Sequence, residues 1–351
     1  MNILKDVILA PYTTFKIGGP ARYFCVVHDQ FDALEAFEFA EKHRLQTFVL
    51  GGGSNLLVSD EGFNGMVIKV EDKGIEILSQ DDNQVLLKVA SGEVWDKVVE
   101  FAVKNIWWGM ENLSHIPGST GAIAVQNVGA YGQEAKNIIE SVVVFNRETH
   151  EIQNLSSNDC KFGYRSSIFN TAQKGKYIIF YITFKLSKTA RPILNYRDLK
   201  LQFPEGGGQL NEIRQAVVKI RDIKFPFPTE AKKGNAGSFF KNPILAQSEF
   251  NELKARLQSG FNKEVADVLE KKKFTDNAQL KIPAAFLIDI CGLKDLEKGG
   301  AAINHNQPLV IINKTGAATA KDVLDLANRV KSAVQNKTGI ELQFEPELIG
   351  F

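Results

Sequence analysis

The segment QTFVLGGGSN, residues 46–55, joins a short apolar run to a cluster of glycine and serine. Just before it, residues 31–45 (FDALEAFEFAEKHRL) repeat apolar side chains at helical spacing. This order predicts a helix, then a strand over 46–50, then a glycine loop.

Strand patterns continue through the first half of the chain. The run KYIIFYITFKL, residues 176–186, is rich in β-branched and aromatic side chains and predicts a strand. An amphipathic helix is expected over 94–105, and further strands are expected at MVIKV (66–70), IEIL (75–78) and VLLKVA (85–90). Residues 2–187 are therefore predicted to be α+β with many short strands.

The second half begins with a helix predicted over 210–223, followed by a connector rich in Pro, Gly and Lys, KFPFPTEAKKGN (224–235), where we place a domain boundary. Beyond it, the pattern predicts helices over 251–258, 283–294 and 320–339, and strands over 309–314 and 341–351. The length of 351 residues suits two or three domains. The fold class is expected to be α+β.

Composition excludes several kinds of function. Lys plus Arg (42) nearly equals Asp plus Glu (41), so the chain lacks the overall basic charge of a general nucleic-acid binder. No apolar run is long enough for a secretory signal or a membrane span, so we expect a cytoplasmic protein without membrane contact.

Cysteine and histidine do not suggest a metal or disulfide framework. The three cysteines, Cys25, Cys160 and Cys291, are far apart and are expected to be reduced core residues. The five histidines form no HExxH motif, so no metal site is expected.

Two glycine-rich stretches could hold phosphate. GGGSN (51–55) and PGSTGA (117–122) each follow an apolar stretch, and NVGAYG (127–132) comes soon after the second. Backbone N–H groups in such loops can converge on phosphate oxygens. Neither loop fits the GxGxxG or GxxxxGK[ST] spacing, and for each loop taken alone an ordinary tight turn is the better explanation. Together they favour a nucleotide site in which two loops clamp one pyrophosphate.

Charged residues mark two further candidates. FGYRSSIF (162–169) sets Arg165 among aromatic and serine residues, where its guanidinium can bind a carboxylate or phosphate bidentately. FEPELIG (344–350) is expected to place Glu345 and Glu347 on one face of a strand. A surface ion pair for Arg165 and a solvated edge strand for the glutamates are the alternatives.

GNAGSFFKNP, residues 234–243, surrounds one serine with unusual neighbours. Gly234 and Gly237 release the backbone before Ser238, and Phe239 and Phe240 are apolar anchors after it. The segment therefore suggests a hydroxyl fixed in a site. The alternative is a turn that feeds a half-buried strand.

Taken in order, GGGSN, PGSTGA with QNVGAYG, GYR, GNAGSFFKNP and EPELIG resemble the UDP-N-acetylenolpyruvoylglucosamine reductase family, flavoenzymes of peptidoglycan precursor synthesis. The resemblance runs from TTFKIGG (13–19) to the last residues. PILNYRDL (192–199) is similar to the extra segment of the longer branch of the family, in which a tyrosine closes over the substrate, and this makes Tyr196 the corresponding candidate.

The resemblance implies an FAD-binding region of the p-cresol methylhydroxylase and vanillyl-alcohol oxidase type. Its two subdomains are expected over 1–70 and 71–222, with a substrate-binding domain over 223–351 whose last residues are allowed to return to the FAD region. FAD is expected to bind without a covalent bond. The residues implied as its contacts are Gly51, Gly52, Gly53, Ser54, Asn55, Leu56, Pro117, Gly118, Ser119, Thr120, Gly121, Asn127, Gly129, Ala130 and Tyr131.

The implied reaction has two halves. NADPH reduces the FAD and leaves, and UDP-N-acetylenolpyruvoylglucosamine then accepts a hydride at C3 and a proton at C2, which gives UDP-N-acetylmuramate. Addition at C3 pushes charge through C2 onto the enolpyruvyl carboxylate, so the site needs a fixed cation and a proton donor. Arg165 corresponds to the cation and Ser238 to the donor.

Glu347 corresponds to the catalytic glutamate of the family, either as a protonated acid that binds the carboxylate or as a group that polarises the intermediate. The implied substrate contacts are Tyr164, Tyr196, Lys224, Asn242 and Lys281. Gly52 departs from many relatives, and the KFPFP segment after Lys224 leaves the register of that lysine open.

Two other functions fit some of these features. One is an FAD-dependent oxidase with a tethered flavin, for which His115 beside PGSTGA is the candidate attachment point. The other is a nucleotide-sugar binder without catalysis. In each case the partner is a small molecule, with no nucleic acid and no membrane, and we expect a monomer.

Overall fold

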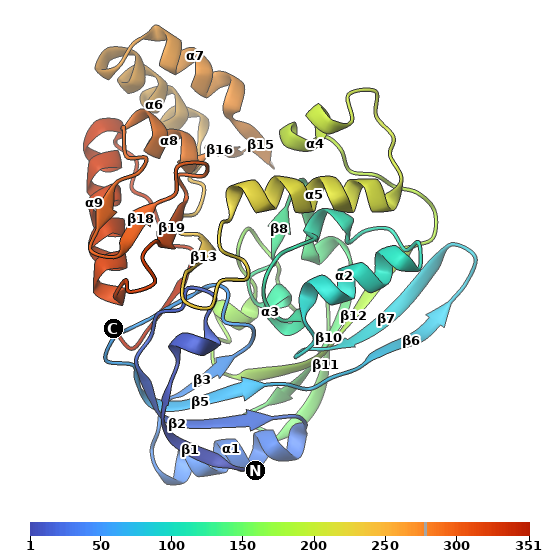
Figure 1. Ribbon diagram of the computed structural model, residues 1–351. Helices are drawn as coiled ribbons and strands as arrows, with labels where there is room; N and C mark the ends of the chain where they lie inside the picture. Colours follow the sequence, from blue (N-terminus) through green and yellow to red (C-terminus); the bar gives the residue numbers. More distant parts are fainter. Residues whose placement is uncertain (277–278) are drawn as a thin grey trace. The chain divides into compact units, whose positions relative to one another are not determined.

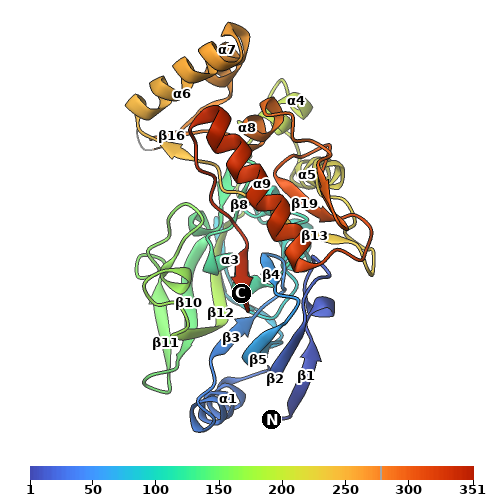
Figure 2. The ribbon, with the colours of Figure 1, turned by 90° about the vertical axis from the view of Figure 1, so that its left-hand side faces the viewer.

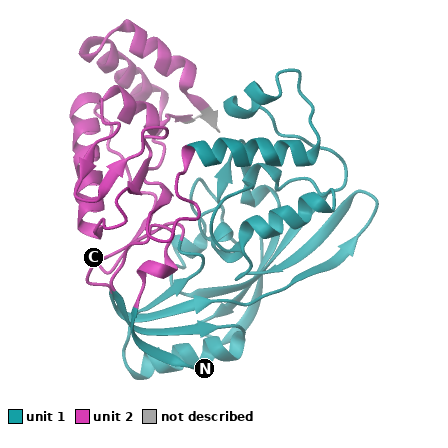
Figure 3. Ribbon diagram, in the orientation of Figure 1, with its two compact units in different colours: residues 1–7, 20–53, 63–223 teal, residues 8–19, 54–62, 224–351 magenta. Residues whose placement is uncertain are grey.

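Residues 1–276 and 279–351 are described by a computed structural model, in which the chain passes between two units (Figure 3). Unit 1 holds residues 1–7, 20–53 and 63–223, and unit 2 holds residues 8–19, 54–62 and 224–351. Both units mix helices with strands, which confirms the α+β class. The change at Ile223 and Lys224 falls beside the boundary expected from the sequence.

The first sheet of unit 1 carries the strand before the first glycine loop. Its strand order is β1-β2-β5-β3, and β2 and β3 both run parallel to β5. The bounds are β1 (Ile3–Ile8), β2 (Pro20–Val27), β3 (Thr47–Leu50) and β5 (Phe63–Val70). The strand predicted over 46–50 is confirmed as β3.

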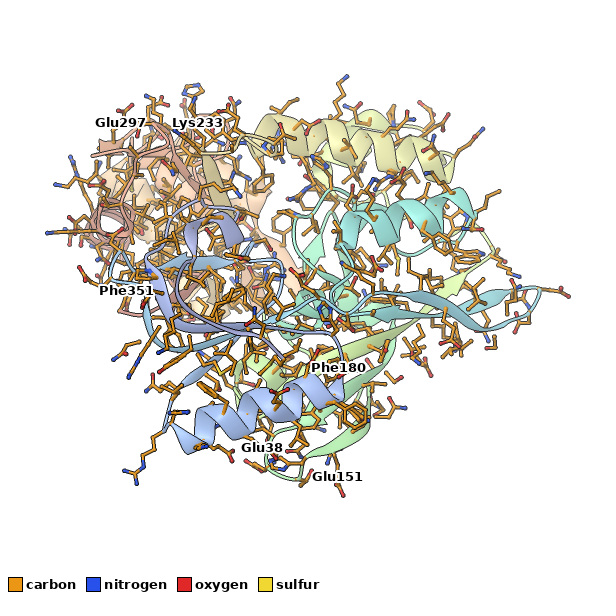
Figure 4. The ribbon with its side chains drawn as sticks, turned by 60° about the horizontal axis from the view of Figure 1, so that its bottom comes forward. Glu38, Glu151, Phe180, Lys233, Glu297 and Phe351 are labelled. Atoms are coloured by element: carbon orange, nitrogen blue, oxygen red, sulfur yellow. The ribbon has the colours of Figure 1, made fainter. Side chains whose placement is uncertain are left out.

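Helix α1 (Gln30–Lys42) confirms the helix predicted over 31–45 and covers this sheet. It begins where the Asp29 carboxylate accepts the N–H groups of Phe31 and Asp32, as an N-cap should. Phe37 on its inner face is fully buried and packs in one cluster with Phe180, whereas Glu38 is exposed on the outer face (Figure 4). The helical period of the apolar residues therefore decides which side meets the core.

The second sheet of unit 1 is antiparallel, with the order β11-β10-β12-β7-β6. Its strands are β6 (Ile75–Gln80), β7 (Gln84–Ala90), β10 (Ile139–Asn146), β11 (Glu151–Ser156) and β12 (Tyr177–Ser187). The predicted strands at 75–78, 85–90 and 176–186 are confirmed. The small pair β8 (Gly129–Ala130) and β9 (Gln133–Glu134) also lies in unit 1, with α3 (Thr120–Val125) and α4 (Arg197–Gln202).

Helices α2 (Trp95–Lys104) and α5 (Leu210–Lys224) lie side by side in unit 1 (Figure 1) and confirm both predicted helices. An ion pair joins them, because Arg214 Nη1 and Nη2 donate to the two carboxylate oxygens of Asp96 at 2.7 and 2.9 Å. The backbone N–H of His115 donates to the same carboxylate at 2.6 Å. Burial alone would raise the pKa of Asp96, but these hydrogen bonds hold it below its usual range.

Unit 2 is built around a sheet of order β13-β19-β18-β17, and α9 (Ala320–Thr338), the long red helix of Figure 2, packs against β17 and β18. Helix α9 begins with a capping box between Thr319 and Asp322, and ends at Gly339, whose φ is +80°. The strands of this sheet are β13 (Gly234–Ser238), β17 (Glu297–Lys298), β18 (Ala301–Ile303) and β19 (Val310–Asn313).

The rest of unit 2 comprises shorter elements. These are β4 (Leu56–Val58), β14 (Ile244–Leu245), α6 (Gln247–Gly260), α7 (Lys263–Lys272), β15 (Phe274–Asp276), β16 (Gln279–Lys281), α8 (Ala284–Ile290) and β20 (Glu347–Ile349). Short 3₁₀ turns complete the two units, at Ala10–Tyr12, Glu111–Leu113, Ala135–Asn137 and Ile168–Asn170. The helices predicted over 251–258, 283–294 and 320–339 are confirmed, whereas α7 was not predicted.

The final strand predicted over 341–351 is wrong in extent. The strand covers Glu347–Ile349 and runs parallel to β4. Glu345 lies outside it, so the two glutamates do not share a strand face as expected. The physical reason is Pro346, which has no N–H to donate to a strand ladder. On either side of it the chain bonds to different segments: Glu345 N–H donates to Phe239 O at 3.0 Å, and Glu347 N–H donates to Asn55 O at 2.9 Å.

The expectation that the cysteines are reduced core residues is confirmed, since Cys25, Cys160 and Cys291 are each buried and unpaired. Within the described ranges, every helix is too short or too polar to cross a bilayer. In the same residues, His, Cys, Asp and Glu side chains form no group of three or more that could hold a metal ion.

A first prediction concerns Gly234, because a Cβ added there would lie 1.9 Å from the carbonyl oxygen of Thr14. The backbone at Thr14 would have to shift to accept a methyl group, so Gly234→Ala should lower the free energy of unfolding by about 2 kcal/mol or more in urea denaturation. Gly260→Ala is the matched control, since a Cβ there meets nothing within 4 Å. Equal stability of the Gly234 variant and wild type would contradict the close approach.

A second prediction uses the lowered pKa of Asp96. A carboxylate with a lowered folded pKa stabilises the protein above its unfolded pKa of about 3.9, and this contribution disappears as pH falls through the folded pKa. Asp96→Asn should therefore cost about 2 kcal/mol at pH 7, and the difference from wild type should shrink below about pH 4. Urea denaturation at both pH values measures it, with the exposed Asp82→Asn as control. A difference that grows on acidification would refute the assignment.

Candidate functional site

The two predicted phosphate loops of unit 1 touch one another. A Cβ at Gly52 would lie 2.4 Å from Gly118 Cα, and one at Gly51 would lie 2.7 Å from Ser119 Oγ. Gly53 and Gly118 have φ values of +64° and +125°, which favour glycine. The glycines therefore allow two backbones to approach as closely as a shared cradle for a pyrophosphate requires.

Backbone hydrogen bonds to residues 91–93 hold the second loop, PGSTGA. Thr120 N–H donates to Glu93 O and Gly121 N–H donates to Ser91 O, both at 2.8 Å. The turn at Ser91 is itself held by Asp72, whose buried carboxylate accepts the N–H and Oγ–H of Ser91 and the N–H of Gly92. Burial raises the pKa of Asp72, so it needs these donors to stay charged. The loop therefore has a fixed shape.

The first loop crosses from one unit to the other. Gly53 is the last residue of that segment of unit 1, and Ser54, Asn55 and Leu56 belong to unit 2. Asn55 Nδ2 donates to Glu345 O at 3.1 Å, and Leu56 pairs with Glu347 between β4 and β20. The predicted cofactor residues 54–56 are thus bonded to the segment that carries the predicted catalytic glutamate.

Asn127 organises the next candidate loop. It is 1% exposed with a φ of +44°, and its Nδ2 donates to Glu134 Oε2 at 3.0 Å and to Gly163 O at 2.9 Å. Its Oδ1 accepts the N–H of Lys136 at 2.9 Å. The side chain therefore ties β8, β9 and the turn at Gly163 together.

Arg165 occupies a strained position in that turn. Backbone bonds between Gly163 and Ser166 close the turn, and Arg165 adopts a φ of +52°, which costs of order 1 kcal/mol for a residue with a Cβ. Its Nη2 donates to Gly129 O at 3.1 Å, and its guanidinium lies 5.4 Å from the centre of the Tyr164 ring. The predicted cation is therefore held beside the predicted cofactor loop.

Two tyrosines complete the cluster in unit 1. Tyr131 is 6% exposed, and its ring meets Tyr196 edge-on with centroids 5.3 Å apart. Burial raises the pKa of Tyr196, and the charge of Arg165 acts in the opposite direction. Unit 1 therefore brings together Gly129, Tyr131, Tyr164, Arg165 and Tyr196, which the sequence assigned to cofactor and substrate.

Ser238 is the last residue of β13, and residues 234–238 form the partly buried strand of the alternative interpretation without a turn inside it. Gly237 just before it has a φ of +73°, and Phe239 and Phe240 just after it are fully buried. Both rings pack against Phe344, with centroid distances of 5.4 and 5.8 Å. As expected, the half-buried serine stands between a permissive residue and two anchors.

Other predicted residues of unit 2 lie on neighbouring segments. Asn242 Oδ1 accepts the N–H of Ala284 at 2.9 Å, at the start of α8. Lys281 is the last residue of β16 and pairs with Ile244. The carbonyl of Lys224 accepts a hydrogen bond from Asn304 Nδ2 at 2.8 Å.

The sequence missed two polar residues of unit 1. Asn112, 1% exposed, donates from Nδ2 to Tyr131 O at 2.7 Å and to Ile193 O at 2.8 Å, while its buried Oδ1 has no partner among the residues described. Arg221, 8% exposed, donates to His115 O at 2.9 Å. No local pattern in the sequence marks either residue, because Ile193 and His115, the partners of Asn112 and Arg221, lie 81 and 106 positions away.

His115, the candidate for flavin attachment, is engaged by acids. Its Nε2 lies 2.9 Å from Asp222 Oδ1, and its Nδ1 lies 4.0 Å from Asp96 Oδ2. These contacts give the imidazole a role in joining the loop to α2 and α5.

The cradle is suited to FAD. Two contacting glycine loops offer N–H groups to a pyrophosphate, and a buried acceptor at Asn112 is the kind of group that native proteins seldom leave without a donor. Four residues other than glycine adopt left-handed conformations in neighbouring segments: His115 lies two residues before PGSTGA, Asn127 and Tyr131 lie in NVGAYG, and Arg165 lies in the turn after Gly163. Strain of this kind gathers at binding sites.

Comparison with known proteins agrees. A family model described as UDP-N-acetylenolpyruvoylglucosamine reductase, C-terminal domain, matches residues 228–349, and one described as FAD binding domain matches residues 21–156. The chain is 35% identical to a UDP-N-acetylenolpyruvoylglucosamine reductase of Pseudomonas syringae pv. syringae over 99% of both chains. It is 37% identical to one of Neisseria meningitidis over 96% of this chain and 95% of the other.

A solved structure gives the same result. The UDP-N-acetylenolpyruvylglucosamine reductase of Thermus caldophilus matches with a TM-score of 0.69 and 26% identity, over 99% of each chain. Of the functions that the sequence left open, these matches support the reductase. The chain is an FAD-binding oxidoreductase that belongs to the UDP-N-acetylenolpyruvoylglucosamine reductase family.

Proposed function

We propose that this chain reduces UDP-N-acetylenolpyruvoylglucosamine to UDP-N-acetylmuramate with NADPH as the electron donor, a step of peptidoglycan precursor synthesis. The observation that carries the proposal is the setting of Ser238, a half-buried hydroxyl at the end of β13 between a left-handed glycine and two buried phenylalanines. Such a setting suits a weak acid that acts through position.

FAD is the cofactor, and when bound it supplies the hydride that adds to C3 of the enolpyruvyl group. The residues proposed to hold it are those of the two contacting loops, Gly51–Gly53 and Pro117–Gly121, with Ser54, Asn55 and Leu56. Asn127, Gly129, Ala130 and Tyr131 are proposed to complete the site.

Arg165 neutralises the enolpyruvyl carboxylate. Hydride addition at C3 sends electron density through C2 toward that carboxylate, and a planar guanidinium can meet both of its oxygens. The hydrogen bond to Gly129 O and the ring of Tyr164 limit the rotation of the side chain before substrate arrives. Little reorganisation is then needed during the reaction.

Ser238 gives its proton to C2. A hydroxyl is a poor acid at neutral pH, but the electron-rich carbon formed after hydride addition is basic enough to accept the proton when the two atoms are held together. Phe239 and Phe240, packed against Phe344, keep the end of β13 from shifting. The product then carries one new C–H bond at C3 and one at C2.

Glu347 is proposed to act at the same carboxylate, either as a protonated acid that binds it or as a group that polarises the intermediate. Its N–H bond to Asn55 O connects it to the GGGSN segment. Tyr164, Tyr196, Lys224, Asn242 and Lys281 are proposed to contact the nucleotide sugar, in which the lysines suit the charge of a diphosphate.

The wider organisation follows from the same proposal. FAD-binding subdomains over 1–70 and 71–222 would precede a substrate domain over 223–351, and the protein would act as a cytoplasmic monomer without nucleic-acid or membrane partners. Gel filtration with light scattering tests the oligomeric state.

The third prediction separates the half-reactions. Ser238→Ala should leave NADPH reduction of the flavin nearly intact and slow reoxidation by the enolpyruvyl substrate by roughly a thousandfold or more, because general acid catalysis contributes about 10²–10⁴. Stopped-flow absorbance measures both steps, with the exposed Ser248→Ala as control. Equal slowing of both halves would exclude Ser238 as the proton donor.

The fourth prediction concerns the guanidinium. Arg165→Lys should slow reoxidation by about a hundredfold, because a point charge cannot reproduce two parallel hydrogen bonds. The exposed Arg329→Lys, on α9, serves as the control. A second half-reaction at the wild-type rate would remove Arg165 from the mechanism.

A further inference from the structure

Asn112 is a buried polar residue that joins two segments of unit 1. It is 1% exposed, and its Nδ2 donates to the carbonyl of Tyr131 at 2.7 Å and to the carbonyl of Ile193 at 2.8 Å. An amide NH₂ group has two donors, so both are used. Its Oδ1 has no partner among the residues described. Every hydrogen bond that this side chain makes with the described part of the chain therefore serves to connect the two segments.

The turn that carries Asn112 is itself held in place. Ser114 Oγ donates to the carbonyl of Glu111 at 2.6 Å, and Trp95 Nε1 donates to the carbonyl of Leu113 at 2.8 Å. Trp95 and Leu113 are both fully buried in one apolar cluster. Asn112 therefore donates to its two carbonyls from a fixed position.

The carbonyl of Ile193 belongs to the segment that carries Tyr196, which we define as residues 191–203 and call the Tyr196 segment. Residues 191–195 have no regular structure and lead into α4. Within residues 1–276 and 279–351, the bond from Asn112 is the one hydrogen bond that residues 191–195 make. The first part of the Tyr196 segment thus depends on this residue for its polar attachment.

Apolar contacts hold the rest of the Tyr196 segment. Helix α4 lies next to α5 (Figure 1), and Leu199 of α4 is fully buried in one cluster with Tyr131 and Val217. The Tyr131 ring meets the Tyr196 ring edge-on, with centroids 5.3 Å apart. Apolar packing is not directional, whereas a hydrogen bond depends on distance and angle. The bond from Asn112 therefore fixes where on this apolar surface the segment lies.

We propose that Asn112 is a positioning residue: it binds the carbonyls of Tyr131 and Ile193 together, holds the Tyr196 segment against the NVGAYG loop, and so controls how well Tyr196 engages the nucleotide-sugar substrate. This inference rests on the proposed function, in which Tyr196 contacts that substrate. Asn112 acts through the backbone of the segment, because it is buried and both of its donors are bonded to carbonyls. Reduction of the flavin by NADPH should not depend on it.

The fifth prediction follows from this role. In the FAD-loaded protein without substrate, Asn112→Leu should speed amide hydrogen exchange in residues 191–203 about tenfold, because a segment that has lost this bond opens more often. Exchange in β12, which ends at Ser187, should keep the wild-type rate. Mass spectrometry of peptic peptides measures both. Asn105→Leu is the matched control, since it removes a side-chain hydrogen bond to a carbonyl, that of Phe101, at an exposed position.

The same change should weaken substrate binding. Asn112→Leu should raise the KM for UDP-N-acetylenolpyruvoylglucosamine by about tenfold and change kcat by less than about threefold at equal FAD content, the pattern of lost binding. Stopped-flow reduction of the flavin by NADPH should keep the wild-type rate. Asn112→Ala removes the same donors with a smaller side chain, and it tests both effects if Asn112→Leu does not fold.

Three results would overturn the inference. Two concern exchange: a wild-type rate in residues 191–203, or a faster rate that β12 shares to the same degree. The third is an unchanged KM in a variant whose Tyr196 segment exchanges faster, because substrate binding would then not depend on how the segment is held. A wild-type protein that fails to turn over the nucleotide sugar would instead refute the proposed function, and the exchange comparison would still decide whether Asn112 holds the segment.

Discussion

The contact between the GGGSN and PGSTGA loops constrains the rest of unit 1. At Gly52 and Gly118 the two backbones come so close that a single methyl group between them would overlap. Several features hold these loops near the contact. Residues 118–121 form backbone hydrogen bonds with residues 91–95, the Asp72 carboxylate accepts hydrogen bonds at Ser91 and Gly92, and β3 ends just before the first loop. Loops that are held by this many hydrogen bonds lose less conformational entropy when a ligand binds.

Strain and order occur together in this region. Asn127, Tyr131 and Arg165 all adopt left-handed backbone conformations that disfavour residues with a Cβ. Each is held by hydrogen bonds or ring contacts with its neighbours. Such positions persist only where the surroundings determine them several times over. These hydrogen bonds and ring contacts therefore maintain backbone conformations that are locally unfavourable.

Elements with a strong repeat could be predicted from the sequence, and elements defined by distant contacts could not. Helix α9 carries a helical period over its whole length, and strand β12 is a long run of β-branched and aromatic residues; both were predicted. The final strand was predicted too long, because Pro346 divides its hydrogen bonds between Phe239 and Asn55.

In the candidate site, too, residues in local motifs could be predicted from the sequence, whereas residues defined by distant contacts could not. Motif residues such as Arg165 and Ser238 stand out in sequence, whereas Asn112 and Arg221 gain meaning from partners 81 and 106 positions away. No local pattern carries that information. The buried polar residues that orient a site are for this reason harder to find than the residues that form it.

The interlaced chain path has a consequence for biosynthesis. In unit 2, Thr14 Oγ1 donates to Asn235 O at 2.7 Å, across 221 residues, and Phe15 packs on Phe239. At translation rates of about 5–20 residues per second, the N-terminal segment must wait roughly 10 to 45 s for its partner strand to leave the ribosome. During that interval Phe15 and Ile17, both buried in the finished protein, have no native neighbours from the C-terminal part of the chain. The N-terminal segment can therefore complete its part of the unit 2 core only after residues 235–239 have been synthesised.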